Sequence, residues 1–268
     1  MLDKILLYLT SFLFLVSPSA HAIKLKVLNN KSQAPNIPAT SYLVMNPASK
    51  TILHGRAMHK KLPPASLTKL MTLLLVYDCL AAKTCSLHDK VRISQQAWSQ
   101  PGSRMFLEKG SKVHLADIIN GIAVVSGNDA SVAAAEYVAG SEKDFTKLMN
   151  KKAKELGMHN SKFMNASGLP RANHYTTAYD LALLASTLYK SYPEIMPILK
   201  KKKFSFNKIS QKNRNRLLWL DPYVTGMKTG HTNTAGFCLV ASAWRNNTPL
   251  IAVALGSKSE KQRDNAGK

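Results

Sequence analysis

The chain has 268 residues, of which 45% are hydrophobic and 19% are charged. This composition is typical of a globular protein and excludes a disordered or fibrous one, and the length is enough to bury one sizeable core. The formal net charge of +22 raises the question of a nucleic acid partner, but the N-terminal sequence argues against one.

The first 22 residues have the pattern of a secretory signal peptide. Lys4 supplies a basic start, residues 5–16 are an apolar run, and residues 20–22 form an A-x-A cleavage box. The run is too short to span a bilayer comfortably, so we expect cleavage after Ala22 rather than an uncleaved anchor. The expected protein is exported to the periplasm or cell envelope and has no nucleic acid partner. Its positive charge then serves either solubility alone or electrostatic association with an anionic envelope surface.

A hairpin and a buried helix are predicted next. The hairpin has a strand, a turn and a returning strand at residues 41–45, 46–49 and 50–53. Pro63 and Pro64 end this region, and a helical pattern starts at Ser66. Apolar residues between positions 67 and 76 cover nearly every face of that helix, which is typical of a helix inside a domain.

The middle of the chain is predicted to be helical, and the last third returns to strands. Helical patterns occupy residues 115–125, 130–138, 145–156 and 177–192. Strand patterns occupy residues 203–206, 237–244 and 250–255, the last two joined by a turn at 245–247. The order of strands, helices and strands predicts an α+β fold, in which both chain ends build an antiparallel sheet beside an inserted helical block.

Three cysteines leave the redox state open. Cys79 and Cys85 are close enough in the sequence to bridge at a helix end in an oxidising compartment, which would leave Cys238 free. Three unpaired thiols fit the sequence equally well. No metal-ligand spacing occurs, and we expect neither a metal nor a cofactor.

The first candidate catalytic motif joins Ser66 and Lys69 at the start of the buried helix. Positions i and i+3 share a helix face, so the amine can touch the hydroxyl. A serine needs a base to take its proton, and a lysine can serve when burial and nearby positive charge lower its pKa. Alternatively, Ser66 only caps the helix. A second Ser-x-x-Lys, from Ser205 to Lys208, is discounted because in a strand these positions point to opposite faces.

The second motif is Ser126-Gly127-Asn128, between two predicted helices. It can present a hydroxyl to the lysine and an amide to a substrate carbonyl. Ser, Gly, Asn and Asp are also common at helix junctions, so Asn128 or Asp129 can equally act as a simple cap.

The third motif is Lys228-Thr229-Gly230, just before the last hairpin. A glycine in a strand edge permits close backbone approach of a ligand. The lysine and threonine supply a positive field and a hydroxyl for a carboxylate. Each motif is weak alone, but a set of this form in this order is typical of penicillin-binding proteins and class A β-lactamases.

With these motifs, the chain resembles the D-alanyl-D-alanine carboxypeptidases of the low-molecular-mass penicillin-binding proteins. The similarity runs from about residue 41 to residue 256. Matching segments are 64–69, 105–107, 126–130, 213–215, 217–219 and 228–232. The resemblance implies the serine β-lactamase/DD-transpeptidase fold, with a five-stranded antiparallel sheet, a helical subdomain and the site in the cleft between them.

The same resemblance implies a role for each catalytic residue. Ser66 would be the nucleophile that forms the acyl-enzyme, and Lys69 would be its general base. Ser126 would relay protons toward the leaving amine. The oxyanion hole would use the backbone N–H groups of Ser66 and His231.

The resemblance also implies the binding residues and the substrate. Asn128 would hold the amide carbonyl of the substrate, and Lys228 would polarise the site. Thr229 would bind the terminal carboxylate, and Arg214 matches an arginine near that carboxylate. The implied reaction removes the terminal D-alanine from peptidoglycan stem peptides, with β-lactams as covalent inhibitors.

The expected domain organisation is a signal peptide at 1–22, a catalytic domain at 23–256 and a polar tail at 257–268. Members of this family often carry a second, β-rich domain and a C-terminal amphipathic helix that lies on the membrane. The tail has no apolar face that could anchor it, and no helix is predicted to close the catalytic domain. A naturally short enzyme and an incomplete chain both fit the sequence.

Three other functions make different predictions. A class A β-lactamase has aspartate in place of Gly127 and a glutamate that activates the deacylating water, but residues 165–171 contain no glutamate. A DD-endopeptidase that cuts cross-links is favoured by the lack of a predicted second domain, whereas the Ser-Gly-Asn motif and the wider match favour the carboxypeptidase. An exported peptidoglycan-binding protein with a dead site is disfavoured, because every expected catalytic side chain is present.

Overall fold

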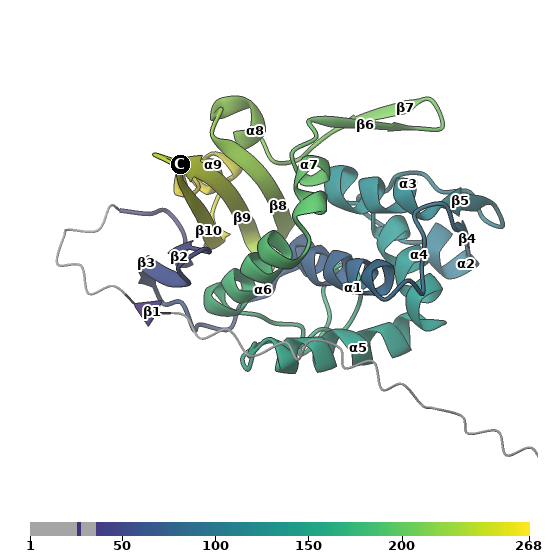
Figure 1. Cartoon of the computed structure of the whole chain (residues 1–268), viewed down its shortest axis with the longest axis horizontal. Helices are drawn as coiled ribbons and strands as arrows, with labels where there is room; N and C mark the ends of the chain where they lie inside the picture. Colours follow the sequence, from purple (N-terminus) through teal and green to yellow (C-terminus); the bar gives the residue numbers. More distant parts are fainter. Residues whose placement is uncertain (1–25, 28–35) are drawn as a thin grey trace, which may run out of the picture.

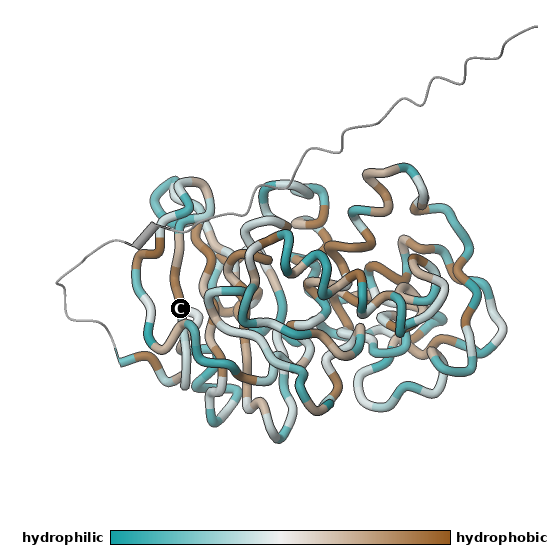
Figure 2. Tube along the Cα trace, turned by 90° about the horizontal axis from the view of Figure 1, so that it is seen from below, coloured by the Kyte–Doolittle hydropathy of each residue, from teal (hydrophilic) through white to brown (hydrophobic). Residues whose placement is uncertain are grey.

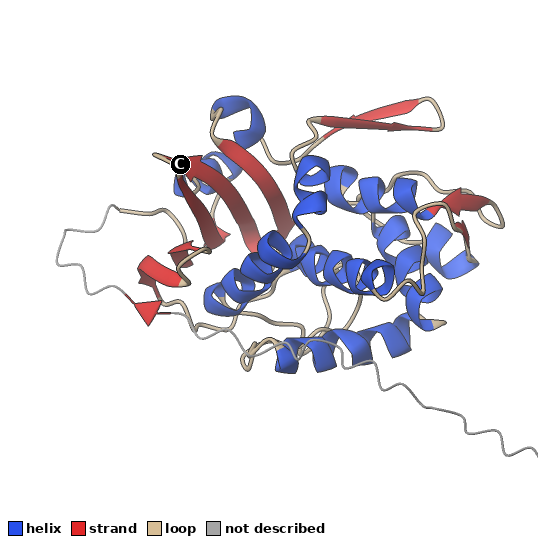
Figure 3. Ribbon diagram, viewed as in Figure 1, coloured by secondary structure: helices blue, strands red, loops and turns tan. Residues whose placement is uncertain are grey.

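The computed structural model describes residues 26–27 and 36–268. The predicted signal peptide lies outside the described residues. A sheet on one side of the molecule adjoins a block of helices on the other, and helix α1 (Lys69–Ala81) runs from the sheet into that block (Figures 1 and 3). This is the α+β arrangement that the order of strands, helices and strands predicts.

The sheet joins both ends of the described chain. Its strands are β1 (Lys26–Val27), β2 (Ser41–Asn46), β3 (Thr51–Arg56), β8 (Val224–Thr232), β9 (Gly236–Arg245) and β10 (Thr248–Ser257). Five of them form an antiparallel sheet in the order β3-β2-β10-β9-β8, and the two-residue β1 adds to β3 in parallel. In β10, Ile251 lies opposite Met45 of β2, which ties the last strand of the chain to the first hairpin.

The helical block comes from the middle of the chain. Its helices are α2 (Gln95–Trp98), α3 (Leu115–Asn120) with a π-helical turn at Gly121–Val125, α4 (Asn128–Ala139), α5 (Glu142–Glu155), α6 (Ala178–Ser191) and α7 (Met196–Leu199). Side chains cap the start of three of them: Ser94, Ser141 and Thr177 accept from the amides of Ala97, Asp144 and Asp180 respectively. Two small two-stranded sheets complete the block: the antiparallel pair β4–β5 (Lys90–Arg92, Lys112–His114) and the hairpin β6–β7 (Lys203–Phe206, Ile209–Lys212).

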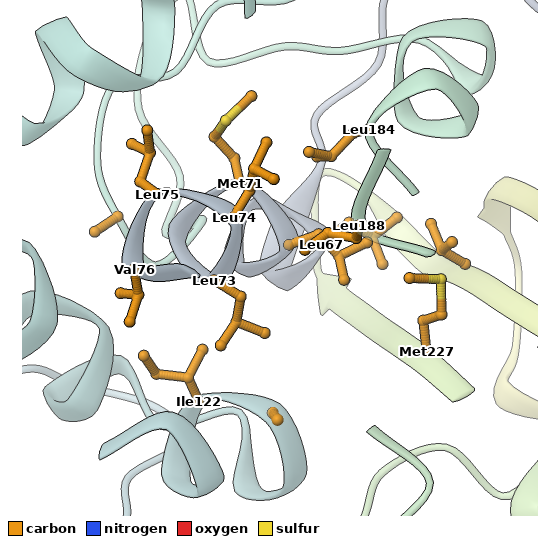
Figure 4. Close-up of a cluster of buried hydrophobic side chains, with 14 of the residues drawn as sticks. Leu67, Met71, Leu73, Leu74, Leu75, Val76, Ile122, Leu184, Leu188 and Met227 are labelled. Atoms are coloured by element: carbon orange, nitrogen blue, oxygen red, sulfur yellow. The ribbon is translucent and has the colours of Figure 1, made fainter. Parts of the chain in front are cut away.

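Helix α1 forms the centre of the core, as its apolar sequence predicts. Its residues from Lys69 to Tyr77 are all buried. In Figure 4, Leu73 and Val76 face Ile122, while Leu67, just before the helix, lies near Leu188 and Met227. Hydrophobic stretches of the trace gather toward the interior, and hydrophilic stretches follow many of the outer loops (Figure 2). Within the described part of the chain, no helix has the length and apolar character that a membrane span needs.

A disulfide closes the far end of α1. Cys79 and Cys85 are bridged, with their Cα atoms 5.4 Å apart. The sequence left this pairing open, and the structure resolves it. Cys238 is a free, buried thiol on β9.

The segment predicted as a polar tail is a helix, so the expectation that no helix closes the catalytic domain is wrong. Residues Glu260–Ala266 form α9, which begins where the Ser259 hydroxyl accepts from the Gln262 amide. The buried residues of α9 are Arg263 and Asp264 rather than apolar side chains. A helix that buries an ion pair has no hydrophobic periodicity, and the sequence pattern therefore missed it.

Candidate active site

Ser66 and Lys69 meet at the start of α1. Ser66 lies in a single 3₁₀ turn, Ala65–Thr68, that leads directly into the helix. The Lys69 Nζ atom donates to Ser66 Oγ over 3.0 Å. No side chain caps the turn or the helix that follows, which argues against the simple capping role for Ser66. The hydroxyl instead faces an amine that can accept its proton.

Burial and positive charge depress the pKa of Lys69. Besides Ser66, its Nζ atom contacts Asn128 Oδ1 at 2.7 Å and the Ser167 carbonyl oxygen at 2.6 Å. The side chain is fully buried, which holds its pKa well below the ordinary value, and the charge of Lys228 lowers it further. Asp129 acts in the opposite direction. The net effect favours the neutral amine that a general base requires.

The junction before α4 holds the middle motif. The Asn128 amide accepts from Lys69 and donates to the Pro101 carbonyl oxygen over 2.6 Å. The neighbouring Asp129 carboxylate accepts from the backbone N–H groups of a facing loop, at residues 105–107. Neither contact is that of a helix cap, although Asp129 also accepts from the next amide. The junction therefore positions the Asn128 amide beside the lysine and fixes the loop at its side.

Ser126 adopts a left-handed backbone conformation, with φ 64° and ψ 34°. It lies between the π-helical turn and α4, where the Gly127 amide donates to the Gly121 carbonyl oxygen over 3.0 Å. A left-handed conformation is uncommon for a residue with a side chain and is often found at functional sites. Ser126 lines the same cavity as Ser66.

Strand β8 supplies the third motif, along the edge that faces the 3₁₀ turn. A Cβ atom added to Gly230 would lie 3.0 Å from the Ser66 nitrogen and 3.1 Å from the Pro64 oxygen. Glycine is therefore favoured at this point of the strand, where a side chain would crowd the catalytic turn, in agreement with the predicted close backbone approach. The Lys228 side chain is buried, and its Nζ atom donates to the Thr229 carbonyl oxygen over 3.0 Å.

Lys228 also has a strongly depressed pKa. Burial contributes most, and the charges of Arg214 and Arg263 contribute further, which lowers the pKa to about 7. The lysine is thus poised to change its charge near neutral pH. A bound anion would favour its protonated form.

A cavity of about 290 Å³ brings the predicted residues together. Five of the predicted site residues line it: Ser66, Ser126, Arg214, Thr229 and His231. The other lining residues are Ser103, Gly230, Phe237, Glu260 and Arg263. Lys69, Asn128 and Lys228 are buried behind this lining. Arg214 is exposed and has no salt bridge within the described ranges. The described residues contain no cluster of His, Cys, Asp or Glu suited to a metal ion.

The family model for D-alanyl-D-alanine carboxypeptidases of the S11 peptidase class matches residues 28–259. The chain belongs to this family. It is 43% identical over 263 residues to the D-alanyl-D-alanine carboxypeptidase DacC of Escherichia coli (strain K12), covering 96% of this chain and 64% of that protein. The chain therefore spans just under two thirds of that relative's length.

Solved structures of penicillin-binding proteins share the fold. Penicillin binding protein 5 from Haemophilus influenzae superposes with a TM-score of 0.85 at 40% identity, covering 88% of this chain and 70% of the other. Penicillin-Binding Protein D2 from Listeria monocytogenes, in a cefotaxime-bound form, superposes with a TM-score of 0.80 at 27% identity, covering 88% and 96%. These neighbours confirm the predicted fold of the carboxypeptidase family.

Sequence reasoning missed one arginine in the site of this family member. Arg263 of α9 is buried and lines the cavity, where its guanidinium bonds to Asp264 at 2.6 Å and to Glu260 at 3.0 Å. No signal in the sequence singled it out, because α9 itself was not predicted. The arginine contributes to the positive field that lowers the pKa of Lys228.

Proposed function

We propose that the chain is a serine-type D-alanyl-D-alanine carboxypeptidase that removes the terminal D-alanine from peptidoglycan stem peptides through an acyl-serine intermediate. The observation that carries this proposal is the 3.0 Å contact between the Lys69 amine and the Ser66 hydroxyl. The pKa of that amine is depressed by burial, so the pair has the geometry of an activated nucleophile, and its surroundings favour the neutral amine that a base requires. Family membership agrees with this chemistry.

Acylation follows from the arrangement of the three motifs. Neutral Lys69 takes the proton from Ser66 as the hydroxyl oxygen attacks the carbonyl carbon of the penultimate D-alanine. The backbone N–H groups of Ser66 and His231 stabilise the developing oxyanion, because β8 runs close to the 3₁₀ turn. When the tetrahedral intermediate collapses and its C–N bond breaks, Ser126 relays the proton held by Lys69 to the departing amine. Water then releases the acyl group.

Positive charge at one end of the cavity suits the substrate's terminal carboxylate. Thr229 and Arg214 line this end, and Lys228 is buried beneath it. A carboxylate placed here satisfies Arg214, which has no ion pair within the structure's described ranges, and keeps Lys228 protonated. We assign to Asn128 the binding of the substrate's amide carbonyl on the acyl side of the cleaved bond.

β-Lactams are the proposed covalent inhibitors, since the Listeria relative binds cefotaxime in its crystal structure. Among the residues that the structure describes, the Lys69 amine contacts a hydroxyl, an amide oxygen and the Ser167 carbonyl oxygen, but no carboxylate. A water held by a glutamate, as in class A β-lactamases, therefore has no equivalent on the Lys69 side of the nucleophile. We expect penicillin to acylate Ser66 and to leave slowly.

The proposed place of action is the periplasm or cell envelope, in the building and shaping of the cell wall. The N-terminal signal pattern supports export. The net charge of +22 supports electrostatic association with anionic envelope polymers or lipid headgroups. Such association should weaken as salt is raised, and binding to wall fragments that is insensitive to salt would contradict it.

Labelling with a fluorescent penicillin, followed by intact-mass analysis, tests the acyl-serine. We expect one adduct on the wild type and none on Ser66→Ala. Ser205→Ala, which alters the discounted second copy of the motif, is the matched control and should label like the wild type. Absence of an adduct on folded wild type would overturn the proposal.

Two peptide substrates then define the reaction. A free stem pentapeptide measures carboxypeptidase activity, and a cross-linked dimer measures the competing endopeptidase activity. We expect faster release of D-alanine from the pentapeptide. Preferential cleavage of the dimer would assign the chain as a DD-endopeptidase instead.

A further inference from the structure

A second hollow lies beside the nucleophile, on the other side from the cavity described above. Its volume is about 380 Å³, and it is lined by Pro63, Pro64, Ala65, Gly168, Leu169, Pro170, Arg171, Ala172, His174, Thr232 and Thr234. The hollow and the cavity share no lining residue. At two places, however, a residue that lines one is the sequence neighbour of a residue that lines the other. Ala65 precedes Ser66, and Thr232 follows His231.

The loop that forms the far wall is held tightly against the catalytic turn. A Cβ atom added to Gly168, which has φ +87°, would lie 1.8 Å from the Ala65 carbonyl oxygen. The preceding Ser167 accepts from Lys69. An occupant of the hollow is therefore placed in a fixed position relative to Ser66.

The direction of the substrate assigns this hollow to its acyl side. Under the proposed function, on which this inference rests, the leaving D-alanine carboxylate lies near Thr229 and Arg214. The peptide must then pass Ser66 and continue toward Thr232, at the far end of β8, and Thr234 in the turn that follows. The residue next to the acyl D-alanine is the third residue of the stem, so its side chain is the group that reaches the hollow.

The lining is mostly apolar, and its polar residues include His174 and Arg171. His174 is 6% exposed, and its Nε2 atom lies 3.1 Å from Thr68 Oγ1. Its Nδ1 atom has no hydrogen-bond partner among the described residues, and an unpaired buried polar atom is costly. When the Thr68 hydroxyl donates to Nε2, the ring proton is on Nδ1, and this N–H can donate to a ligand.

Arg171 supplies a positive charge at the edge of the hollow. Its side chain is exposed at the edge of the hollow and forms no salt bridge within the part of the chain that the structure describes. The lining contains no aspartate or glutamate that could neutralise it. An ammonium group would be repelled here, whereas a carboxylate could accept from the guanidinium.

We propose that this hollow binds the side chain of the stem peptide's third residue, and that Arg171 selects a side chain that ends in a carboxylate over one that ends only in an amine. The apolar lining receives the methylene groups, while the guanidinium and the His174 N–H bind the carboxylate. Attraction of the carboxylate to this guanidinium, together with repulsion of a competing ammonium group, is expected to give about a tenfold preference in kcat/KM, which corresponds to about 1.4 kcal/mol.

Two pentapeptides that differ only at the third residue test the proposal. One carries diaminopimelate, whose side chain ends in an amine and a carboxylate, and the other carries lysine. We expect the wild type to prefer the first by about tenfold. In Arg171→Ala the two kcat/KM values should agree within about twofold, with the value for the lysine peptide unchanged or higher, because a repulsive charge has been removed. Arg171→Lys should retain part of the preference.

Arg92→Ala is the matched control. Arg92 is an exposed arginine of β4, at the far end of the helical block from the sheet (Figure 1). This variant removes the same charge, so a preference caused by the net charge of the whole protein would fall equally in both. Equal cleavage of the two peptides by the wild type would overturn the inference and leave the proposed function standing. Cleavage of neither would overturn the proposed function, and the inference with it.

Discussion

Replacing Lys228 by methionine should make the protein more stable and less active at neutral pH. Lys228 is buried and has one hydrogen bond, to the Thr229 carbonyl oxygen. Its pKa is lowered from 10.5 to about 7. Each pKa unit corresponds to about 1.4 kcal/mol, so the charged form is disfavoured by about 4–5 kcal/mol on folding. Methionine has a similar length and is uncharged.

The substitution also removes a hydrogen bond, which offsets part of this gain in stability. The Thr229 carbonyl oxygen loses its side-chain donor, which costs about 1–3 kcal/mol. The expected net stabilisation at pH 7 is therefore about 2 kcal/mol. Since the pKa is lower in the folded state, the unfolded wild type holds more protons between pH 7 and pH 10.5, and wild-type stability rises with pH across that window. The advantage of the variant should fall to near zero by about pH 9.5.

Urea unfolding at pH 7 and at pH 9.5 measures this difference. Lys90→Met is the matched control, since Lys90 is exposed on β4, and it should change the free energy of unfolding by less than about 0.5 kcal/mol. Acylation by penicillin should be slower in Lys228→Met, because the positive field of the site is reduced. Destabilisation at pH 7, or a gain that is the same at both pH values, would refute the reasoning.

Three further predictions concern the catalytic base, the loop beside the site and the disulfide. The acylation rate of the wild type should fall as pH drops through the depressed pKa of Lys69 rather than near 10.5, and an inflection near pH 10.5 would contradict this. Lys69→Arg, whose side chain cannot give up its proton, should react with labelled penicillin about 10²–10⁴-fold more slowly. Asp129→Ala should lower the free energy of unfolding in urea by about 3 kcal/mol or more, because three loop amides lose their acceptor; a loss below about 1 kcal/mol would count against that role. The double variant Cys79→Ser, Cys85→Ser removes a bridge of sequence separation 6 and should cost about 2 kcal/mol; its penicillin labelling should stay unchanged, because the bridge lies at the opposite end of α1 from Ser66.

The parts of the fold that the sequence predicted are those with strong periodicity. The apolar run after Ser66 became the central helix, and the alternating runs near both chain ends became neighbouring strands of one sheet. In the site, residue type at fixed spacing was informative, because i and i+3 at a helix start constrain two side chains to meet. The 3.0 Å contact between Ser66 and Lys69 is that meeting.

Features that depend on long-range contacts were beyond the sequence. Helix α9 buries Arg263 and Asp264, which a periodicity argument reads as exposed polar residues. The Lys69–Ser167 contact spans 98 positions, so the loop around Ser167 carried no local signal of its place in the site. The hollow beside it was missed for the same reason, since Arg171 and Thr232 are brought together by the tertiary fold.

Gly127 shows how a motif position can be set by its surroundings rather than by chemistry. A Cβ atom there would lie 2.8 Å from Asp129 Oδ1 and 3.3 Å from the Met105 nitrogen. That carboxylate oxygen is the one that accepts from the Met105 amide. A larger residue at 127 would therefore push Asp129 away from the loop that it fixes. The glycine in this Ser-Gly-Asn motif is required because Asp129 uses the space that a side chain would occupy.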